Sequence, residues 1–269
     1  MSEIQFRFVR GTYLSGGLTM GSIKKRYLIL GIVLLIVIGL IAAGIGILMY
    51  AGLPLKDGTQ LAEGRVRVVV TRWGPVAIGA YLFRLEGGGF GLIDAGIEPD
   101  AKSIRIELAR LGGMEDDVRV IIFTHGHDDH TAGARSFPKA EVYALEPEVN
   151  WINAQGIRVT RGLKDGESFA LFGTVVEVFS LPGHTSGSAA YLVHGVLFLG
   201  DSAASVNDGK GSVMPNTILC EDKEQNIKSL RELAKRLSSR RNDIRHIAFG
   251  HQGPVDGLAP LLNWAKKSF

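Results

Sequence analysis

Hydrophobic residues in this chain form one long uninterrupted run followed by many short ones. Between Tyr27 and Leu55 there is no charged residue. About 20 apolar residues in a helix cross a bilayer, so the run is long enough to span a membrane. Its apolar core is far longer than the roughly 7–15 residues of a cleaved signal peptide, and no clear small-residue cleavage site follows it. The pattern therefore predicts one transmembrane anchor over residues 27–52.

The charges that flank this run predict its orientation. A basic block, Lys24–Arg26, precedes it directly, whereas only Lys56 lies near its other end. Because cytoplasmic flanks are enriched in Lys and Arg, residues 1–26 are expected to be a cytoplasmic tail, and the rest of the chain is expected outside, in the periplasm or at the cell exterior. Translation from Met1 and translation from Met20, which opens "MGSIKKRYLIL", are both open.

Short apolar runs after the anchor predict a domain that begins with strands. Residues 53–64 are polar with scattered glycines and are expected to be a linker. Period-two alternation then predicts strands, and spacings of three and four predict helices between the later strands. The first half is expected to contain strands at Val66–Thr71, Ala77–Leu85, Phe90–Ile93, Val118–Phe123 and Glu141–Leu145, with helices at Ala101–Leu111, near Thr131–Ser136 and from Pro147.

The second half repeats this order of strands before helices. Paired strands are expected around Gly173 and around the turn His194-Gly195, and a last buried strand at Ile244–Phe249. Helices are expected at Lys223–Leu237 and Leu258–Lys267. Strands followed by strand–helix alternation, twice over, predict an α/β fold in which two sheets pack together with helices outside, as a single domain over residues 65–269.

The distribution of charge narrows the choice of partners. Residues 1–64 hold six Lys or Arg and three Asp or Glu, and the remaining residues hold 24 of each, so the formal charge of +3 comes from the N-terminal segment. A neutral domain has no basic groove, and we expect no nucleic-acid partner. The single cysteine, Cys220, excludes an intrachain disulfide and a thiolate-rich metal cage.

Candidate chemistry is concentrated in "THGHDDH" at residues 124–130, which holds three of the seven histidines. On an extended turn, His125 and His127 at a spacing of two reach one metal ion together. Asp129 and His130 then point toward a neighbouring position. A helical zinc motif would space its histidines by four, so the sequence predicts a metal site on a loop at the end of a buried strand.

Three later segments have the same pattern, in which a buried strand ends in glycine followed by a possible ligand. These are His184 in "FSLPGHTSGS", Asp201 in "VLFLGDSAAS" and His251 in "HIAFGHQGP". A lone histidine is more often solvated or hydrogen-bonded in the core, and we interpret His194 and His246 in this way. The repeated pattern instead predicts that several strand ends meet at one metal site, where α/β folds place their active sites.

This pattern resembles the metallo-β-lactamase-fold hydrolase superfamily over roughly residues 65–269. The matching residues are "THGHDDH" as the H-x-H-x-D-H signature, the three later segments, and Asp94 in "GLIDAG". The resemblance implies an αββα sandwich with two divalent metal ions at one edge. Zn²⁺ is the expected ion, with Mn or Fe as alternatives.

The resemblance also implies a role for each matched residue. The first metal ion would be held by three imidazoles, those of His125, His127 and His184. The second would be held by Asp129, His130 and His251. Asp201 would bridge the two ions, and Asp94 would orient the ligands without binding metal. A metal-bound hydroxide would be the nucleophile, with Asp129 also catalytic because it would orient that hydroxide.

The residue type at Asp201 narrows the range of expected substrates. True β-lactamases of this superfamily commonly have Cys or Ser at the matching position, whereas Asp resembles the glyoxalase II, lactonase and phosphodiesterase branches. Glyoxalase II-like enzymes add a C-terminal helical region, and this chain ends eighteen residues after His251, so glutathione thioesters are not expected. The Gly-rich loop Ser202–Cys220 is expected to border the pocket.

The expected function is a membrane-anchored hydrolase that cleaves a small-molecule ester, lactone or thioester. Three alternatives stay open: a β-lactamase of the same fold, a phosphodiesterase, and a mononuclear iron dioxygenase. The sequence indicates neither the substrate itself nor an oligomeric state.

Overall fold

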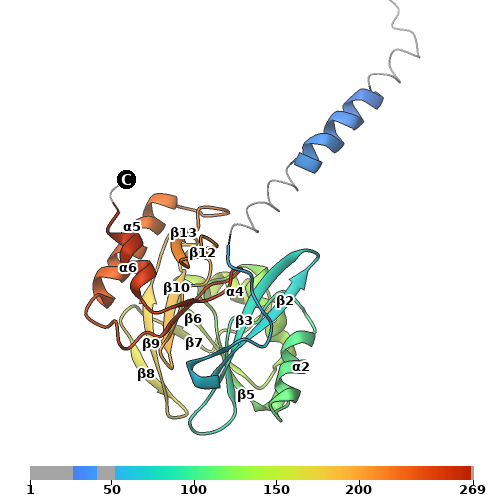
Figure 1. Cartoon of the computed structure of the whole chain (residues 1–269). Coiled ribbons are helices and arrows are strands. Elements are labelled where there is room, and N and C mark those ends of the chain that lie inside the picture. Colours follow the sequence, from blue (N-terminus) through green and yellow to red (C-terminus); the bar gives the residue numbers. More distant parts are fainter. Residues whose placement is uncertain (1–26, 41–51, 268–269) are drawn as a thin grey trace, which may run out of the picture. The chain divides into compact units, whose positions relative to one another are not determined.

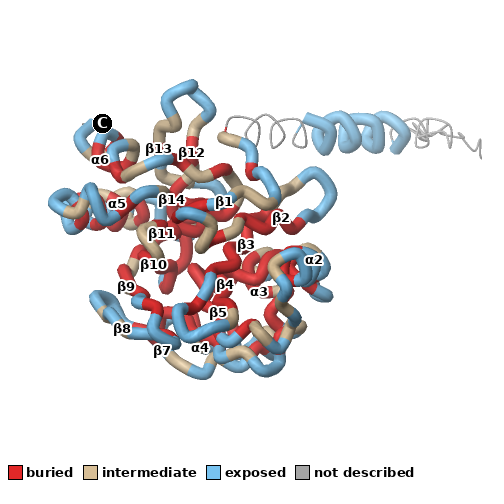
Figure 2. The backbone as a smooth tube through the Cα atoms, turned by 60° about the horizontal axis from the view of Figure 1, so that its bottom comes forward, coloured by how far each residue is buried: buried red, intermediate tan, exposed pale blue. Residues whose placement is uncertain are grey.

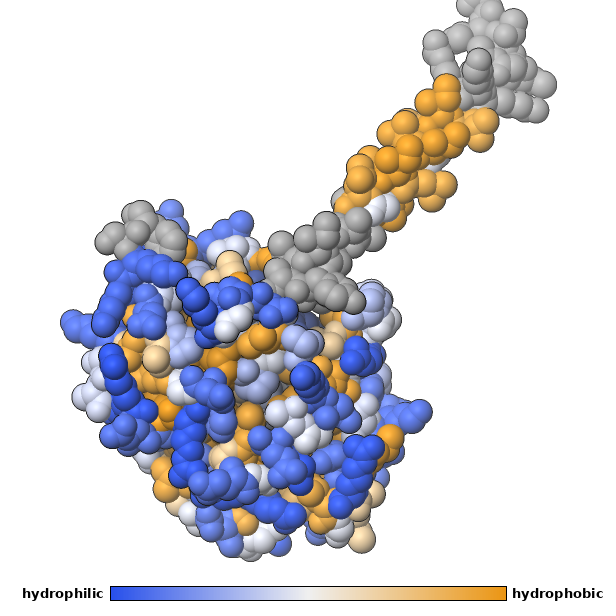
Figure 3. All heavy atoms as spheres, viewed as in Figure 1, coloured by the Kyte–Doolittle hydropathy of each residue, from blue (hydrophilic) through white to orange (hydrophobic). Residues whose placement is uncertain are grey.

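The structure is a computed structural model that describes residues 27–40 and 52–267. The chain divides into two units, Met1–Ile47 and Leu48–Phe269. In the first unit, residues 27–40 form a helix whose side chains are all exposed and, as Figure 3 shows, mostly apolar. Over the described part of the chain, no helix combines the length and the apolar character that a membrane crossing requires.

The predicted anchor is only partly covered by the structure. Residues 41–51 of the expected span lie outside the described residues, as does the whole of the expected cytoplasmic tail, 1–26. The anchor and its orientation therefore stay predictions.

The first sheet of the larger unit contains seven strands in sequence order. The strands up to β4 pair antiparallel, and β4 to β7 pair parallel. The strands are β1 (Gln60–Leu61), β2 (Val66–Trp73), β3 (Val76–Arg84), β4 (Phe90–Ile93), β5 (Val118–Ile122), β6 (Glu141–Leu145) and β7 (Arg161–Leu163). The helices between them are α2 (Lys102–Arg110), α3 (Asp128–Thr131) and α4 (Val149–Ala154), with short 3₁₀ turns at η1 (Ala62–Gly64), η2 (Glu115–Asp117), η3 (Ala132–Ser136) and η4 (Glu146–Glu148).

The second sheet contains six strands in the order β15-β14-β11-β10-β9-β8. Its strands are β8 (Ser168–Leu171), β9 (Thr174–Ser180), β10 (Ala189–Val193), β11 (Val196–Phe198), β14 (His246–Ala248) and β15 (Val255–Asp256). A separate hairpin pairs β12 (Ala203–Val206) with β13 (Ser212–Pro215), and the helices are α5 (Lys223–Leu237) and α6 (Ala259–Ala265).

The two sheets face each other, and helices cover their outer faces (Figure 1). Strand β10 illustrates why: Ala189, Tyr191 and Val193 belong to a core shared by both sheets, whereas Ala190 and Leu192 belong to a core shared with α5 and α6. A third core packs α2 and α4 on the first sheet. Buried strands therefore form the centre of the molecule in Figure 2, and the predicted αββα sandwich is confirmed.

Two tyrosines join the sheets by reciprocal hydrogen bonds. Tyr81 on β3 donates to the carbonyl of Phe249 after β14 at 2.5 Å, and Tyr191 on β10 donates to the carbonyl of Phe123 after β5 at 2.9 Å. Both tyrosines are buried. Because Phe123 and Phe249 immediately precede the predicted ligand segments, these bonds fix the two sheets at that edge.

The expected linker, residues 53–64, is instead part of the folded domain. It contains β1 and η1, and Leu55 and Leu61 are buried in the core between the sheets. The backbone N–H of Gly58 in this segment donates to the carbonyl of Val68 at 2.9 Å. The linker prediction was wrong because scattered polar residues concealed the apolar residues that anchor this segment.

Candidate metal centre

The predicted ligands meet because strand ends of both sheets lie at one edge. Parallel β4 and β5 bring Asp94 beside the loop that follows β5, since parallel strands end on the same side. Parallel β11 and β14 do the same for Asp201 and His251. His184 comes from the turn between β9 and β10.

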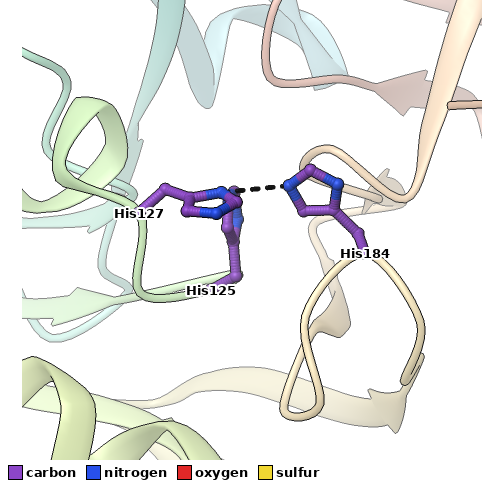
Figure 4. Close-up of side chains that lie close together, drawn as sticks. All are labelled: His125, His127 and His184. Carbon is purple, nitrogen blue, oxygen red and sulfur yellow. Dashed lines mark hydrogen bonds between the residues drawn. The ribbon is translucent and has the colours of Figure 1, made fainter. Parts of the chain in front are cut away.

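Three imidazoles form the first candidate set, His125, His127 and His184. Figure 4 shows His125 and His127 on one loop, facing His184 on an opposing loop. His184 Nε2 lies 3.1 Å from His127 Nδ1. Two nitrogens bound to one tetrahedral Zn²⁺ at its usual bond length would be about 3.3 Å apart, so the observed spacing suits a shared cation.

The second candidate set is Asp129, His130 and His251, and Asp201 lies between the two sets. His251 Nε2 is 3.3 Å from Asp129 Oδ2 and 3.1 Å from Asp201 Oδ2. Asp201 Oδ1 is 3.4 Å from His130 Nε2, and its Oδ2 is 3.8 Å from His184 Nε2. The Asp201 carboxylate therefore reaches imidazoles of both sets.

Asp94 contacts the ligands from behind. It accepts hydrogen bonds from His130 Nδ1 and from the Thr124 hydroxyl, each at 2.8 Å. Because Thr124 Oγ1 donates its proton to Asp94, the same oxygen must act as the acceptor for His125 Nδ1, which lies 3.0 Å away. Asp94 thus fixes the tautomers of two histidines and leaves both Nε2 atoms pointing into the centre.

Several buried polar atoms in the centre fit a bound cation. His125 Nε2, His130 Nε2 and Asp201 Oδ1 make no hydrogen bond with any described residue, although each is buried. Buried polar groups normally have partners, and these three atoms belong to one group whose ligand atoms lie within 4.8 Å of one another. An all-nitrogen-and-oxygen donor set suits Zn²⁺, Mn²⁺ or Fe²⁺.

The electrostatic environment differs between the two sets. Burial lowers the pKa of His184 to about 4 and, together with His130, lowers that of His125, so both rings are neutral ligands at pH 7. Burial also acts to lower the pKa of His251, but Asp201 and Asp129 outweigh it and raise the pKa to about 10. The carboxylates of Asp129 and Asp201 therefore create a negative potential around the second set that favours positive charge there.

All eight residues predicted from the sequence lie at this edge, and their roles as ligands stay a prediction. His194 and His246 lie elsewhere, where His194 pairs with the Arg84 carbonyl at 2.8 Å and His246 with Asp256 at 2.9 Å. Thr124 is a contributor that sequence reasoning missed. Its position directly before His125 was the available signal.

The comparisons with known proteins agree with this geometry. The family model described as "Metallo-beta-lactamase superfamily" matches residues 73–251, more than half of the chain. A hydroxyacylglutathione hydrolase from Aeromonas hydrophila is 35% identical over 107 residues, which are 38% of this chain and 40% of that protein. One from Vibrio campbellii is 34% identical over 115 residues, 41% and 42% of the two chains. The chain thus spans about two fifths of the length of these relatives.

Solved structures share the fold. A metallo-beta-lactamase from Erythrobacter litoralis has a TM-score of 0.58 at 18% identity, with 77% of this chain and 95% of that chain covered. A metallo-beta-lactamase family protein from Thermus thermophilus has a TM-score of 0.54 at 22% identity, with 75% and 77% covered. Because the family model matches more than half of the chain, the chain belongs to the metallo-beta-lactamase superfamily, and the solved structures share its fold.

Proposed function

We propose that the chain is a di-metal hydrolase that cleaves a small ester, lactone or thioester. The observation that carries this proposal is the position of Asp201, whose two oxygens lie 3.1 to 3.8 Å from imidazoles of both ligand sets. Two cations a few ångströms apart repel each other, and a shared anionic ligand offsets that repulsion. When bound, such ions polarise a substrate carbonyl and lower the pKa of water.

Asp129 is proposed as the catalytic residue of the chain. Its side chain is 28% exposed, whereas that of Asp201 is 9% exposed, so Asp129 is the more solvent-accessible of these two acids of the centre. Its Oδ2 lies 3.3 Å from His251 Nε2, a spacing at which both atoms could bind the same cation. We infer that Asp129 orients the attacking water and accepts its proton.

Apolar side chains beside the centre support a substrate with an apolar acyl group. Ile218 is 49% exposed and Leu219 is 85% exposed. Their loop is tied to two ligand segments, because Glu221 N donates to the His184 carbonyl and Asn216 N donates to the Ser202 carbonyl, each at 3.1 Å. The relatives named hydroxyacylglutathione hydrolase support thioesters in particular, and glutathione thioesters belong among the substrates to test.

Metal analysis and a substrate panel on the full chain test this proposal. We expect two equivalents of Zn, Mn or Fe, with hydrolysis of an ester, lactone or thioester that is lost on chelation. Asp201→Ala should lower turnover at least a hundredfold, which corresponds to about 2.7 kcal/mol or more of transition-state stabilisation. Asp116→Ala, a change of an exposed aspartate, should leave turnover unchanged.

Other outcomes would contradict the proposal. One equivalent of iron with oxygen uptake would indicate a dioxygenase. Turnover confined to a β-lactam or a phosphodiester in the same panel would place the chain with a different substrate class.

We also propose that the chain is membrane-tethered, with the N-terminus in the cytoplasm and the hydrolase domain outside. The uncharged run that begins at Tyr27 and the basic block Lys24–Arg26 support this orientation. The exposed apolar side chains of residues 27–40 also support it, because a contiguous apolar surface of that kind is unfavourable in water.

A further inference from the structure

A short helical segment beside the centre has three side chains directed at the first ligand loop. Glu148 ends η4, Trp151 lies within α4, and Gln155 follows α4. Spacings of three and four place these residues on one face of a helix. Each of them contacts the loop His125–His127.

Glu148 connects that loop to the loop that carries His184. It is 1% exposed. Its Oε1 accepts hydrogen bonds from the Thr185 hydroxyl at 2.8 Å and from the Gly187 amide at 2.9 Å. Its Oε2 faces Gly126, although it makes no hydrogen bond of good geometry with a described residue. Burial raises the pKa of Glu148, and the Thr185 hydroxyl with the amides of Gly126 and Gly187 opposes that rise.

Both loops approach Glu148 so closely that only glycine fits. A Cβ atom at Gly126 would lie 2.6 Å from Glu148 Oε2 and 2.9 Å from the Trp151 ring. A Cβ atom at Gly187 would lie 2.6 Å from Glu148 Cγ and 2.7 Å from its Oε1. Gly126 in "THGHDDH" and Gly187 in "PGHTSGS" are thus both explained by one buried side chain.

Trp151 and Gln155 hold the same loop at two further points. The Trp151 ring lies edge-on to the His127 ring, with centroids 5.3 Å apart. Gln155 Nε2 donates to the Gly126 carbonyl at 2.5 Å, and its Oε1 accepts from the Thr131 hydroxyl at 2.7 Å. The backbone between His125 and His127 is therefore fixed on both sides.

We propose that Glu148 is a positioning residue that sets the affinity of the three-histidine site for its metal ion. The two loops come from different sheets, and Glu148 is the side chain that hydrogen-bonds to one while facing the other. The inference rests on the proposed di-metal centre. Groups that orient metal ligands typically change affinity by about 10–100-fold when altered, because the ligand atoms lose their preset spacing.

Cobalt titration of the metal-stripped full chain tests this role. The isosteric Glu148→Gln keeps the acceptor to Thr185 but loses the charge and presents an amide group to Gly126. The visible absorption of bound Co²⁺ reports two binding steps. In Glu148→Gln we expect the affinity of one step to fall at least tenfold and that of the other to stay within twofold of the original chain. Glu146→Gln is the matched control, since Glu146 is exposed in the same turn and pairs with Lys164.

Each result has a distinct meaning. Circular dichroism and thermal unfolding of the stripped proteins check that Glu148→Gln is folded, and Glu148→Asp, which keeps the charge, should restore part of the affinity. If the affinities of both binding steps are unchanged in Glu148→Gln, or if both fall equally, the positioning role is overturned while the hydrolase proposal stays intact. An original chain that binds no divalent cation would overturn the proposed function and this inference with it.

Discussion

Three histidine rings of the centre have one nitrogen held by the protein and the other turned inward. Thr124 holds Nδ1 of His125, Asp94 holds Nδ1 of His130, and the Ala77 carbonyl accepts from Nδ1 of His251 at 3.1 Å. An imidazole binds a cation in its neutral form, and in that form each of these bonds would leave the Nε2 lone pair free to do so. The orientation of these candidate ligands is thus set by residues outside the proposed ligand sets.

Asp94 is the most consequential of these partners, because it acts on two rings. In Asp94→Asn the charge that favours His130 as a donor is lost, so we expect the metal affinity of the second site to fall about 10–100-fold. Competition with a chromogenic chelator would measure this. Asp100→Asn, a change of an exposed aspartate, is the control. Equal affinities in both variants would show that Asp94 has no orienting role.

At the scale of elements, sequence reasoning was most accurate where one face of a helix is buried. The predicted helix Lys223–Leu237 has those bounds in the structure, because Asp222 caps its first turn by accepting from Gln225 N at 2.9 Å and Leu230 and Leu237 pack on the second sheet. The helix expected near Thr131–Ser136 begins instead at Asp128 and continues as a 3₁₀ turn, since tight packing there overrides the short apolar pattern.

The hairpin of β12 and β13 was missed within the expected pocket loop, because its Gly-rich turn obscures the alternation of its strands. Contacts that depend on tertiary structure were also not predicted from the sequence. Glu148 and Gln155 belong to a short helical segment that contains no recognisable chemical motif. Their partners, Thr185 and Gly126, are far away in sequence. The candidate ligands were predictable because each follows a buried strand, whereas Glu148 and Gln155 follow no such pattern.

The reciprocal tyrosine bonds give an element-scale prediction. Tyr191→Phe leaves the buried carbonyl of Phe123 without its donor, so we expect the free energy of unfolding to fall by about 1–3 kcal/mol. Tyr143→Phe should change it by less than about 0.5 kcal/mol, because the partner of its hydroxyl, Glu141, is exposed and can be hydrated. Urea unfolding would measure both values. Equal losses would show that the bond between the sheets has no special weight.

At the scale of the whole molecule, charge and hydrophobicity are separated along the chain. The domain from residue 65 onward is formally neutral, whereas the preceding part carries the excess of +3 and the long apolar run. The proposed membrane tether rests on this division.

Fractionation tests the tether. The full chain should remain in the membrane pellet after carbonate extraction, and a reporter fused after Phe269 should be active only outside the cytoplasm. Replacing Leu34 and Val37 by Arg should release the chain, because each charge costs about 2.5–3.5 kcal/mol at the centre of a membrane helix. Replacing the exposed Lys266 and Lys267 by Leu, far from the apolar run in the sequence, is the control. A native chain found in the soluble fraction would contradict the anchor.

The division of the ligands between two sheets has a consequence for unfolding. His125 and His251 are separated by 126 positions in the chain, yet each belongs to a ligand group that includes His130. A di-metal cluster held by these groups closes a loop of more than a hundred residues, as a disulfide would, and the entropy of the unfolded chain falls accordingly. In a protein with a single cysteine, the catalytic ions would then also serve as its covalent-like crosslink, and loss of metal would loosen the whole sandwich as well as end catalysis.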